Sequence, residues 1–341
     1  MPQIIPKNPV SVESHWQKEL RQCVTDPQKL IDLLELDWAD LSFDAAARKL
    51  FPLRVPMPFV DRMKKGDVSD PLFRQGFTLR DEFIEVPGFS HDPVEEQDAA
   101  QKGLLHKYQS RVLLIVRGGC AGNCRYCFRR HFPYQDNSAS KAEWLDAFKY
   151  IAADTNINEV IFSGGDPLMA KDEHLSWMAR ELEKIEHVQT LRIHTRLPVV
   201  IPSRINDDFL HWFTKSRLKP VMIVHINHAN EFDEHLKTVL LSLKMAGVTL
   251  LNQSVLLADV NDSADALVEL HEKLFEAGVL PYYLHLLDKV SGAGHFLVSD
   301  TRAKQLMAEL IKRQPGYLVP KLVREIGGQP GKTPVDLNLH P

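Results

Sequence analysis

Between residues 111 and 313, short apolar runs alternate with longer stretches whose apolar positions recur at helical spacing. Short apolar runs are typical of strands buried on both faces, and the longer stretches are typical of helices with one apolar face. The predicted strands cover 111–116, 159–162, 190–194, 221–225, 248–252 and 282–287. The predicted helices that follow them cover 140–152, 171–186, 206–216, 231–246, 263–277 and 299–313. Such an alternation indicates an α/β protein with a parallel sheet covered by helices.

The two flanks of this repeated pattern differ from it. Apolar residues recur at helical spacing in 16–20 and 30–36, which predicts a mainly helical first region. The polar, acidic stretch 87–101 contains proline and is predicted to be a connecting segment. We therefore expect three parts, which are a mainly helical region at 1–105, a core of six βα units at 106–314 and a C-terminal segment at 315–341.

Composition narrows the class of protein. The chain has 341 residues, of which 44% are hydrophobic and 25% charged, and its formal net charge is −4. These values are ordinary for a soluble protein, and they favour neither a nucleic-acid nor a membrane partner. No apolar run approaches the ~20 residues that span a bilayer, and the N-terminus lacks the basic start and apolar core of a signal peptide. We expect a cytoplasmic protein.

Three of the four cysteines form one short motif, Cys120, Cys124 and Cys127. Three thiolates in a C-x3-C-x2-C loop can hold three irons of a 4Fe–4S cluster and leave the fourth iron open to another ligand. A zinc site is the alternative, with His131 as a fourth ligand, although structural zinc sites often use two C-x2-C pairs and no second pair exists here. A zinc-binding interaction module, which would not be an enzyme, therefore remains an alternative hypothesis.

Polar groups follow each of the six predicted strands. In βα barrels, catalytic residues lie at the C-terminal ends of the strands, so these groups are expected to line one face. In chain order they are the cysteine motif, Ser163-Gly-Gly-Asp-Pro167, Arg196, His225, the pair Gln253 and Ser254, and Asp288.

A second distinctive element lies near the end of the chain, where Lys332 sits in the glycine- and proline-rich run 327–334. A nucleotide-binding P-loop needs glycine where this chain has Ile326, and Pro334 disfavours the helix that would follow. A lysine on a restricted loop can instead form a Schiff base with pyridoxal 5′-phosphate (PLP).

Together, these motifs resemble those of the lysine 2,3-aminomutase family of radical S-adenosylmethionine (SAM) enzymes, over about residues 50–338. The shared elements are the cysteine loop with Arg-Tyr-Cys-Phe-Arg-Arg at 125–130, Ser-Gly-Gly-Asp at 163–166, Asn-Gln-Ser-Val-Leu-Leu at 252–257, Pro-Tyr-Tyr at 281–283 with Asp288, and Gly-Lys-Thr-Pro at 331–334. The resemblance implies a partial (βα)6 radical SAM barrel that uses a 4Fe–4S cluster, SAM and PLP.

The resemblance also implies roles for individual residues. The cluster would be held by Cys120, Cys124 and Cys127, and PLP by Lys332 together with Tyr108 and Arg196 at its phosphate. SAM would be bound by Ser163, Gly164, Gly165, Asp166, His225 and Gln253. The substrate carboxylate would pair with Arg129, and its ε-ammonium with Asp288 and Glu325. The family has aspartate at the position of Glu325 and an all-glycine loop before the PLP lysine, so this chain departs from the family at both places.

The implied reaction converts L-lysine to β-lysine by migration of the amino group from C2 to C3. The chain stops soon after the PLP loop, which resembles the shorter family members that make (R)-β-lysine for the modification of elongation factor P. An electron-donor protein for the cluster and a homodimer are the partners we consider. The alternatives are an aminomutase acting on another amino acid such as glutamate, and a radical SAM enzyme without PLP.

Overall fold

The computed structural model describes residues 14–41, 51–96, 101–135, 137, 139–329 and 331–339. Parts of the predicted helical first region (1–13 and 42–50) and of the predicted connecting segment (97–100) lie outside these residues.

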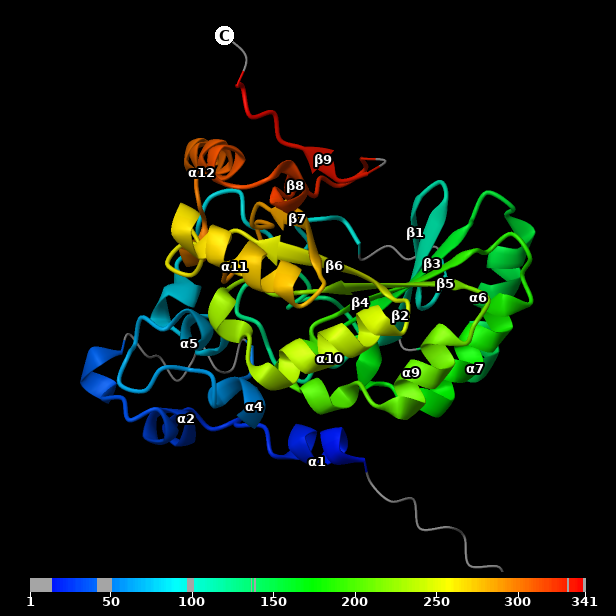
Figure 1. Cartoon of the computed structure of the whole chain (residues 1–341), viewed down its shortest axis with the longest axis horizontal. Coiled ribbons are helices and arrows are strands. Elements are labelled where there is room, and N and C mark those ends of the chain that lie inside the picture. Colours follow the sequence, from blue (N-terminus) through cyan, green and yellow to red (C-terminus); the bar gives the residue numbers. More distant parts are fainter. Residues whose placement is uncertain are drawn as a thin grey trace, which may run out of the picture.

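One nine-stranded sheet forms the centre of the protein, and its strands follow one another in chain order (Figure 1). Strands β2 to β8 pair in parallel, while β1 and β9 pair antiparallel at the two edges. The bounds are β1 Leu104–Tyr108, β2 Arg111–Arg117, β3 Glu159–Gly164, β4 Thr190–Thr195, β5 Lys219–Val224, β6 Thr249–Val255, β7 Leu280–His285, β8 Lys321–Arg324 and β9 Thr333–Pro334. The six predicted strands are confirmed as β2 to β7, and the parallel order of these strands is as expected.

Helices follow the strands and cover the outer face of the sheet (Figure 1). They are α6 Lys141–Ala153, α7 Asp172–Glu183, α9 Asp207–Thr214, α10 Glu234–Met245, α11 Ala264–Glu276 and α12 Asp300–Arg313. Side chains of Ser140, Asn206 and Asp233 accept backbone N–H bonds where α6, α9 and α10 begin. Such caps satisfy donors that have no partner inside the helix, so each helix begins close to its predicted position.

The shared core lies between the sheet and these helices. Phe162 of β3 and Ile193 of β4 are fully buried, and Trp144 of α6 packs in the same apolar cluster. Parallel strands can be buried on both faces, so apolar residues can follow one another, as Val160-Ile-Phe162 does in β3. β4 instead alternates buried with half-buried residues.

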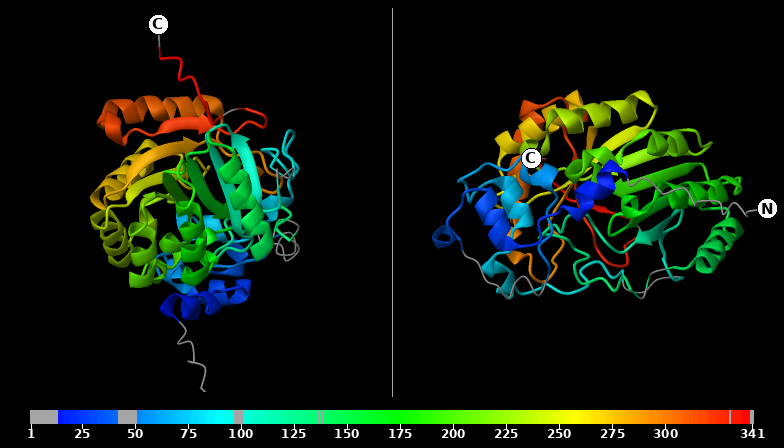
Figure 2. Two further views of the ribbon diagram at one scale, coloured as in Figure 1. Left: turned by 90° about the vertical axis from the view of Figure 1, so that its right-hand side faces the viewer. Right: turned by 90° about the horizontal axis from the view of Figure 1, so that it is seen from below.

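The N-terminal region packs beneath the sheet as short helices joined by irregular segments (Figure 2). Its helices are α1 His15–Arg21, α2 Pro27–Leu33, α4 Met57–Val60 and α5 Pro71–Gly76. Trp16, Leu30 and Phe73 belong to the same apolar cluster as the sheet residues, so this region is continuous with the main core. Short turns of helix complete the described chain: α8 Leu197–Val200 and the 3₁₀ turns Trp38–Asp40, Arg80–Phe83, Pro167–Met169, Pro202–Arg204, Ala229–Glu231, Gly294–Phe296 and Gly316–Leu318.

The sheet extends beyond the six strands that the apolar pattern predicts. β1 begins before residue 106, and β8 and β9 lie beyond residue 314, so one sheet crosses both predicted domain boundaries. The three strands that the pattern missed are short, with five residues in β1, four in β8 and two in β9. Within the described part of the chain, no helix has the length and apolar character needed to cross a membrane.

Candidate active site

The cysteine motif lies on the loop that follows β2, at the C-terminal edge of the sheet. Cys120, Cys124 and Cys127 are free thiols, and the amide of Cys127 donates to the carbonyl of Cys124 at 3.1 Å. Burial raises the pKa of Cys120 well above its usual value, and the negative charges of Cys127, Asp166 and Cys124 raise it further. Burial and the charge of Cys124 likewise raise the pKa of Cys127 to about 11.

These shifts report three thiols that are close enough to repel one another when ionised. Bound iron cations would remove that repulsion, and soft thiolates are the ligands that Fe–S clusters use, so this donor set fits a 4Fe–4S cluster. In the described residues, no three His, Cys, Asp or Glu side chains already form a site for a single metal ion. His131 faces the carbonyl of Ser291 at 3.2 Å, and its ring stacks on His91 with centroids 4.2 Å apart.

Residues of the N-terminal region stabilise the cysteine loop through hydrogen bonds and buried ion pairs. The amide of Asn123 donates to the carbonyl of Arg54 at 3.0 Å, and the Arg54 guanidinium donates to the carbonyl of Ala121 at 3.1 Å. Arg125, inside the motif, is fully buried and pairs with Glu82, which also pairs with Arg130 at 2.7 Å. The chain before the sheet therefore contributes directly to the conformation of the loop.

The glycine motif at the end of β3 packs its backbone against the cysteine loop. The amide of Gly165 donates to the carbonyl of Arg117 at 2.7 Å. A Cβ atom on Gly165 would lie 2.8 Å from the carbonyl oxygens of both Gly118 and Gly119. Gly164 has φ of +127°, a conformation that side chains rarely permit. The two glycines are required by this close approach, and their predicted contact with SAM stays a prediction.

Asp166 uses its carboxylate to join two strand ends. It accepts hydrogen bonds from the Thr195 hydroxyl at 2.8 Å and from the backbone amides of Arg196 at 2.8 Å and Leu197 at 2.9 Å. Burial raises the pKa of Asp166, and these hydrogen bonds oppose that effect. Asp166 therefore fixes the turn at the end of β4, and its predicted contact with SAM stays a prediction.

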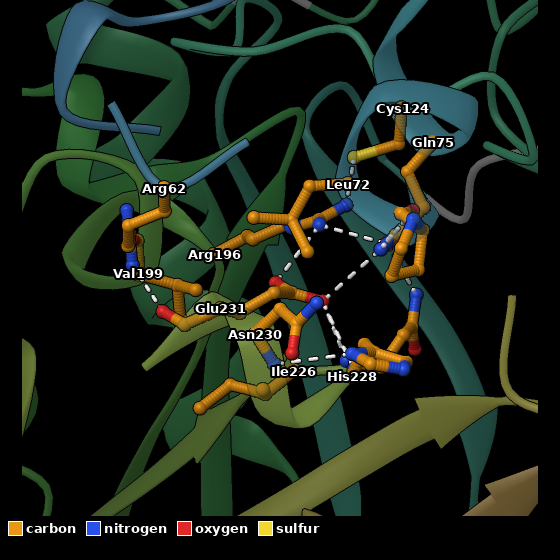
Figure 3. A network of polar contacts seen from close by, with 12 residues as sticks. Arg62, Leu72, Gln75, Cys124, Arg196, Val199, Ile226, His228, Asn230 and Glu231 are labelled. Carbon is orange, nitrogen blue, oxygen red and sulfur yellow. Dashed lines mark hydrogen bonds and ion pairs between the residues drawn. The ribbon is translucent and has the colours of Figure 1, made fainter. Parts of the chain in front are cut away.

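Arg196 reaches toward the cysteine loop (Figure 3). Its guanidinium donates to the Sγ of Cys124 at 2.7 Å and to the hydroxyl of Tyr126, and it pairs with Glu231 at 3.0 Å. Gln75 of α5 accepts from the same guanidinium at 2.9 Å. Arg196 was predicted to contact the PLP phosphate, and its partners in the structure include Cys124 and Tyr126 of the cysteine loop. Tyr108, the other residue predicted at the PLP phosphate, lies beside Glu325.

The residues predicted to line the SAM site lie on the same edge of the sheet. His225 directly follows β5, and Gln253 lies in β6 in register with Tyr283 of β7. Burial lowers the pKa of His225 to about 3, and the positive charges of Arg196, Lys332 and Arg129 lower it further, so the imidazole is neutral. The Nε2 atom of His225 is buried without a protein partner, as are those of His194 and His285.

Lys332 is placed by the β8–β9 pair. It directly precedes β9, which pairs with β8, and Glu325 directly follows β8. The Lys332 ammonium lies 2.8 Å from Glu325 Oε2, while Lys107 Nζ lies 3.2 Å from Glu325 Oε1 and the Tyr108 hydroxyl donates to that oxygen at 2.8 Å. Burial alone would raise the pKa of Glu325, but Lys332, Lys107 and Tyr108 outweigh it and hold the pKa at about 2.

Asp288 follows β7 and belongs to the same charged group. The residue is only half-buried, but protein atoms surround its carboxyl, and this desolvation raises its pKa to about 7. The charge of Lys332 lowers this pKa, and the charges of Glu325 and Glu96 raise it. Asp288, Glu325 and Lys332 are therefore within electrostatic reach of one another, and their predicted roles toward the substrate and PLP stay predictions.

Arg129 completes the group, and its partner is a residue that the sequence did not single out. Both its Nε and Nη2 atoms contact Glu96 Oε2, at 2.8 and 2.7 Å. Its Nη1 donates to the Ser163 hydroxyl at 3.3 Å and to the carbonyl of Gly164 at 3.1 Å. Neither Glu96 nor Lys107 was identified from the sequence, because neither lies in a recognisable motif. The acidic character of 87–101 was the only signal that could have pointed to Glu96.

Comparison with known proteins adds to this geometry. A family profile described as "Radical SAM superfamily" matches residues 114–285. The protein called L-lysine 2,3-aminomutase in Escherichia coli (strain K12) is 55% identical over 99% of this chain and 99% of its own length. The protein of that name in Haemophilus influenzae is 54% identical over 97% of this chain and 98% of its own. The one in Clostridium subterminale is 32% identical over 94% of this chain and 77% of its own.

Proposed function

Because the chain belongs to the lysine 2,3-aminomutase family of radical SAM enzymes, we propose that it is an isomerase that converts L-lysine to β-lysine. The reaction moves the amino group from C2 to C3 and a hydrogen from C3 to C2, so no atom or electron is gained or lost overall. The observation that carries the proposal is the charged group formed by Arg129, Asp288, Glu325 and Lys332 at the C-terminal edge of the sheet.

Charge matching supports lysine as the substrate. Arg129 can pair with a carboxylate through two parallel N–H bonds, which is the geometry that guanidinium groups favour. Asp288 and Glu325 are two acids that can hold one ammonium group. Glutamate would place a second carboxylate against these acids, and like charges in a partly buried site repel strongly. The two acids therefore favour lysine over a glutamate-type substrate.

The residues at the strand ends support the cofactors that this chemistry needs. The cluster and SAM supply a radical that removes hydrogen, and PLP supplies a group that carries the migrating nitrogen. The thiols of Cys120, Cys124 and Cys127 would hold the cluster. The amine of Lys332 would hold PLP, with Tyr108 beside it. The orphaned Nε2 of the neutral His225 is available to a ligand bound within the barrel.

The finer features are also proposals. We infer (R)-β-lysine as the product and elongation factor P as its destination, because segments 129–134, 225–230 and 317–322 resemble the shorter family members with that role. The enzyme would then work in the cytoplasm, where a reducing protein supplies electrons to the cluster. We also retain a homodimer as the proposed assembly.

The test is an anaerobic assay of the reconstituted protein. We would supply iron, sulfide, SAM, PLP, dithionite and L-lysine, and separate the products by chiral chromatography. β-Lysine is expected from the native chain and should be lost in Lys332→Ala and in Cys124→Ala. Lys321→Ala is the matched control, because Lys321 lies on the neighbouring strand β8 and is exposed.

Different failures have different meanings. Borohydride reduction should attach the pyridoxal chromophore to the native chain and not to Lys332→Ala, and an unlabelled native chain would favour a radical SAM enzyme without PLP. Cleavage of SAM without β-lysine would retain the radical chemistry and reject the substrate. Bound zinc, with no cluster after reconstitution, would reject the proposal in favour of a zinc-binding module.

A further inference from the structure

Two of the three charged groups assigned to the substrate, Arg129 and Glu325, already have partners of opposite charge inside the protein. Arg129 pairs with Glu96, Glu96 Oε1 lies 3.7 Å from Lys107, and Lys107 lies 3.2 Å from Glu325. Glu325 in turn contacts Lys332 at 2.8 Å. These side chains are largely buried. The exposed fraction is 8% for Arg129, 10% for Glu96 and Glu325, 19% for Lys107 and 21% for Lys332. The charges therefore form one connected chain with little screening by water.

The guanidinium of Arg129 has no free edge for a second carboxylate. Its Nη1 donates to Ser163 and to the carbonyl of Gly164, while Nε and Nη2 contact Glu96. Four of its five N–H groups are therefore used, which leaves one. A carboxylate that binds an arginine as a fork needs two N–H groups on one edge. The edge formed by Nε and Nη2 is the one that Glu96 holds.

We propose that Glu96 competes with the substrate carboxylate for Arg129, that the substrate displaces Glu96 when it binds, and that Glu96 then keeps Lys107 as its cationic partner. This inference rests on the proposed function, in which Arg129 binds the substrate carboxylate. Glu96 is then a specificity-determining residue, because an incoming ligand must bind Arg129 better than a carboxylate already in place.

Lys107 provides the positive charge with which Glu96 can pair after it leaves Arg129. It lies between Glu96 and Glu325, so it shares its charge between two carboxylates. When Glu325 turns to the substrate ammonium, Lys107 loses one of these partners and Glu96 is the other. The carboxylate of the substrate thus frees Glu96 from Arg129. The ammonium group of the substrate draws Glu325 away from Lys107, and Lys107 can then pair with Glu96. A ligand with both ends is favoured over one that has either end alone.

The test is equilibrium binding of two ligands to the reconstituted holoprotein without SAM, so that no turnover occurs. L-Lysine carries the carboxylate, and L-lysinamide carries an uncharged amide in its place. In Glu96→Gln, we expect L-lysine to bind about tenfold more tightly and L-lysinamide to bind unchanged, because the amide does not compete with Glu96 for Arg129. Glu96→Asp, whose carboxylate is one methylene shorter, should show the same trend.

Lys107→Met should act in the opposite direction. Without Lys107, the displaced Glu96 has no cation to receive it, so L-lysine should bind several-fold more weakly than to the native protein. Glu85→Gln is the control, because Glu85 is exposed and precedes the same segment. A loss of packing would weaken both ligands in both variants, whereas the exchange predicts changes of opposite sign for L-lysine.

The outcomes separate this inference from the function on which it rests. If Arg129→Gln abolishes L-lysine binding while Glu96→Gln leaves it unchanged or weaker, the exchange is wrong and the substrate assignment stands. If Arg129→Gln leaves L-lysine binding unchanged, Arg129 is not the carboxylate site, and both the exchange and that part of the proposed function are wrong.

Discussion

Two acidic residues of the site respond to their surroundings in opposite ways. Glu325 directly contacts two ammonium groups and a phenol, which overcome desolvation and lower its pKa to about 2. Desolvation and the negative charges of Glu325 and Glu96 raise the pKa of Asp288 to about 7, although the positive charge of Lys332 opposes this rise. Glu325 is therefore ionised at every physiological pH, whereas Asp288 changes charge near neutrality.

The binding of L-lysine should depend on this titration. Asp288 attracts the ε-ammonium only in its ionised form, so the dissociation constant should increase as pH falls below about 7, with an upper limit of about tenfold per pH unit. Calorimetric titrations between about pH 5.5 and 7.5 would measure this slope. Asp288→Asn should bind weakly and show a flatter profile. A native profile without slope in this range would contradict the prediction.

The raised pKa of Asp288 also makes the stability of the folded chain depend on pH. An unfolded aspartate ionises near its usual pKa of about 4, so between about pH 4 and 7 the folded chain holds more protons at Asp288 than the unfolded chain. The contribution of Asp288 to stability therefore falls as pH rises through this window. A carboxyl retained at such a cost is characteristic of a functional site.

At the scale of elements, the end of β3 and the loop after β2 form one unit. Gly164 and Gly165 allow their backbone to lie against residues 117–119, and the amide of Asp166 donates to the carbonyl of Gly119 at 3.1 Å. Asp166 then joins this unit to the beginning of α8 through Leu197. The cysteine loop is thus supported by the next two strand ends.

Gly165→Ala should disturb this unit. The added Cβ would meet two backbone carbonyls at 2.8 Å, and backbone cannot move aside as a flexible side chain can. We expect a loss of stability of about 1–3 kcal/mol and reduced iron content after reconstitution. Gly119→Ala is the control, because a Cβ there meets nothing within 4 Å. Equal iron content in the two variants would show that the close approach is not needed for the cluster.

At the scale of the whole molecule, the N-terminal region is part of the active-site structure. It shares the main apolar core with the sheet, and Glu82 from this region lies fully buried against Arg125 and Arg130 of the cysteine loop. The β8–β9 pair closes the other side and carries Lys332 to Glu325. The site therefore depends on both flanks of the repeated core.

Glu82→Gln should reveal this dependence. Two buried guanidinium groups would lose their shared negative partner, and leaving buried charges unpaired costs about 3–5 kcal/mol. Urea denaturation should show the loss of stability, and metal analysis should show poorer retention of iron. Glu85→Gln, an exposed neighbour, should behave like the native protein. Normal stability of Glu82→Gln would mean that the ion pairs contribute little.

The repeated core could be predicted because its signals are local. Apolar runs and helical spacing mark β2 to β7 and the helices that follow them, since burial on two faces or on one face leaves a different period in the chain. The cysteine spacing places three thiols on one loop without any knowledge of the rest of the fold. The parallel order of the strands then brings their polar ends to one edge.

The partners of these polar groups could not be predicted in the same way. Glu96 and Arg129 are far apart along the chain, as are Arg196 and Cys124, and no periodicity connects them. The two-residue strand β9 exists only because β8 offers it hydrogen-bonding partners. Interactions across long loops depend on the packing of the whole chain, so tertiary structure decided which charge faces which, and local pattern decided where the strands and helices lie.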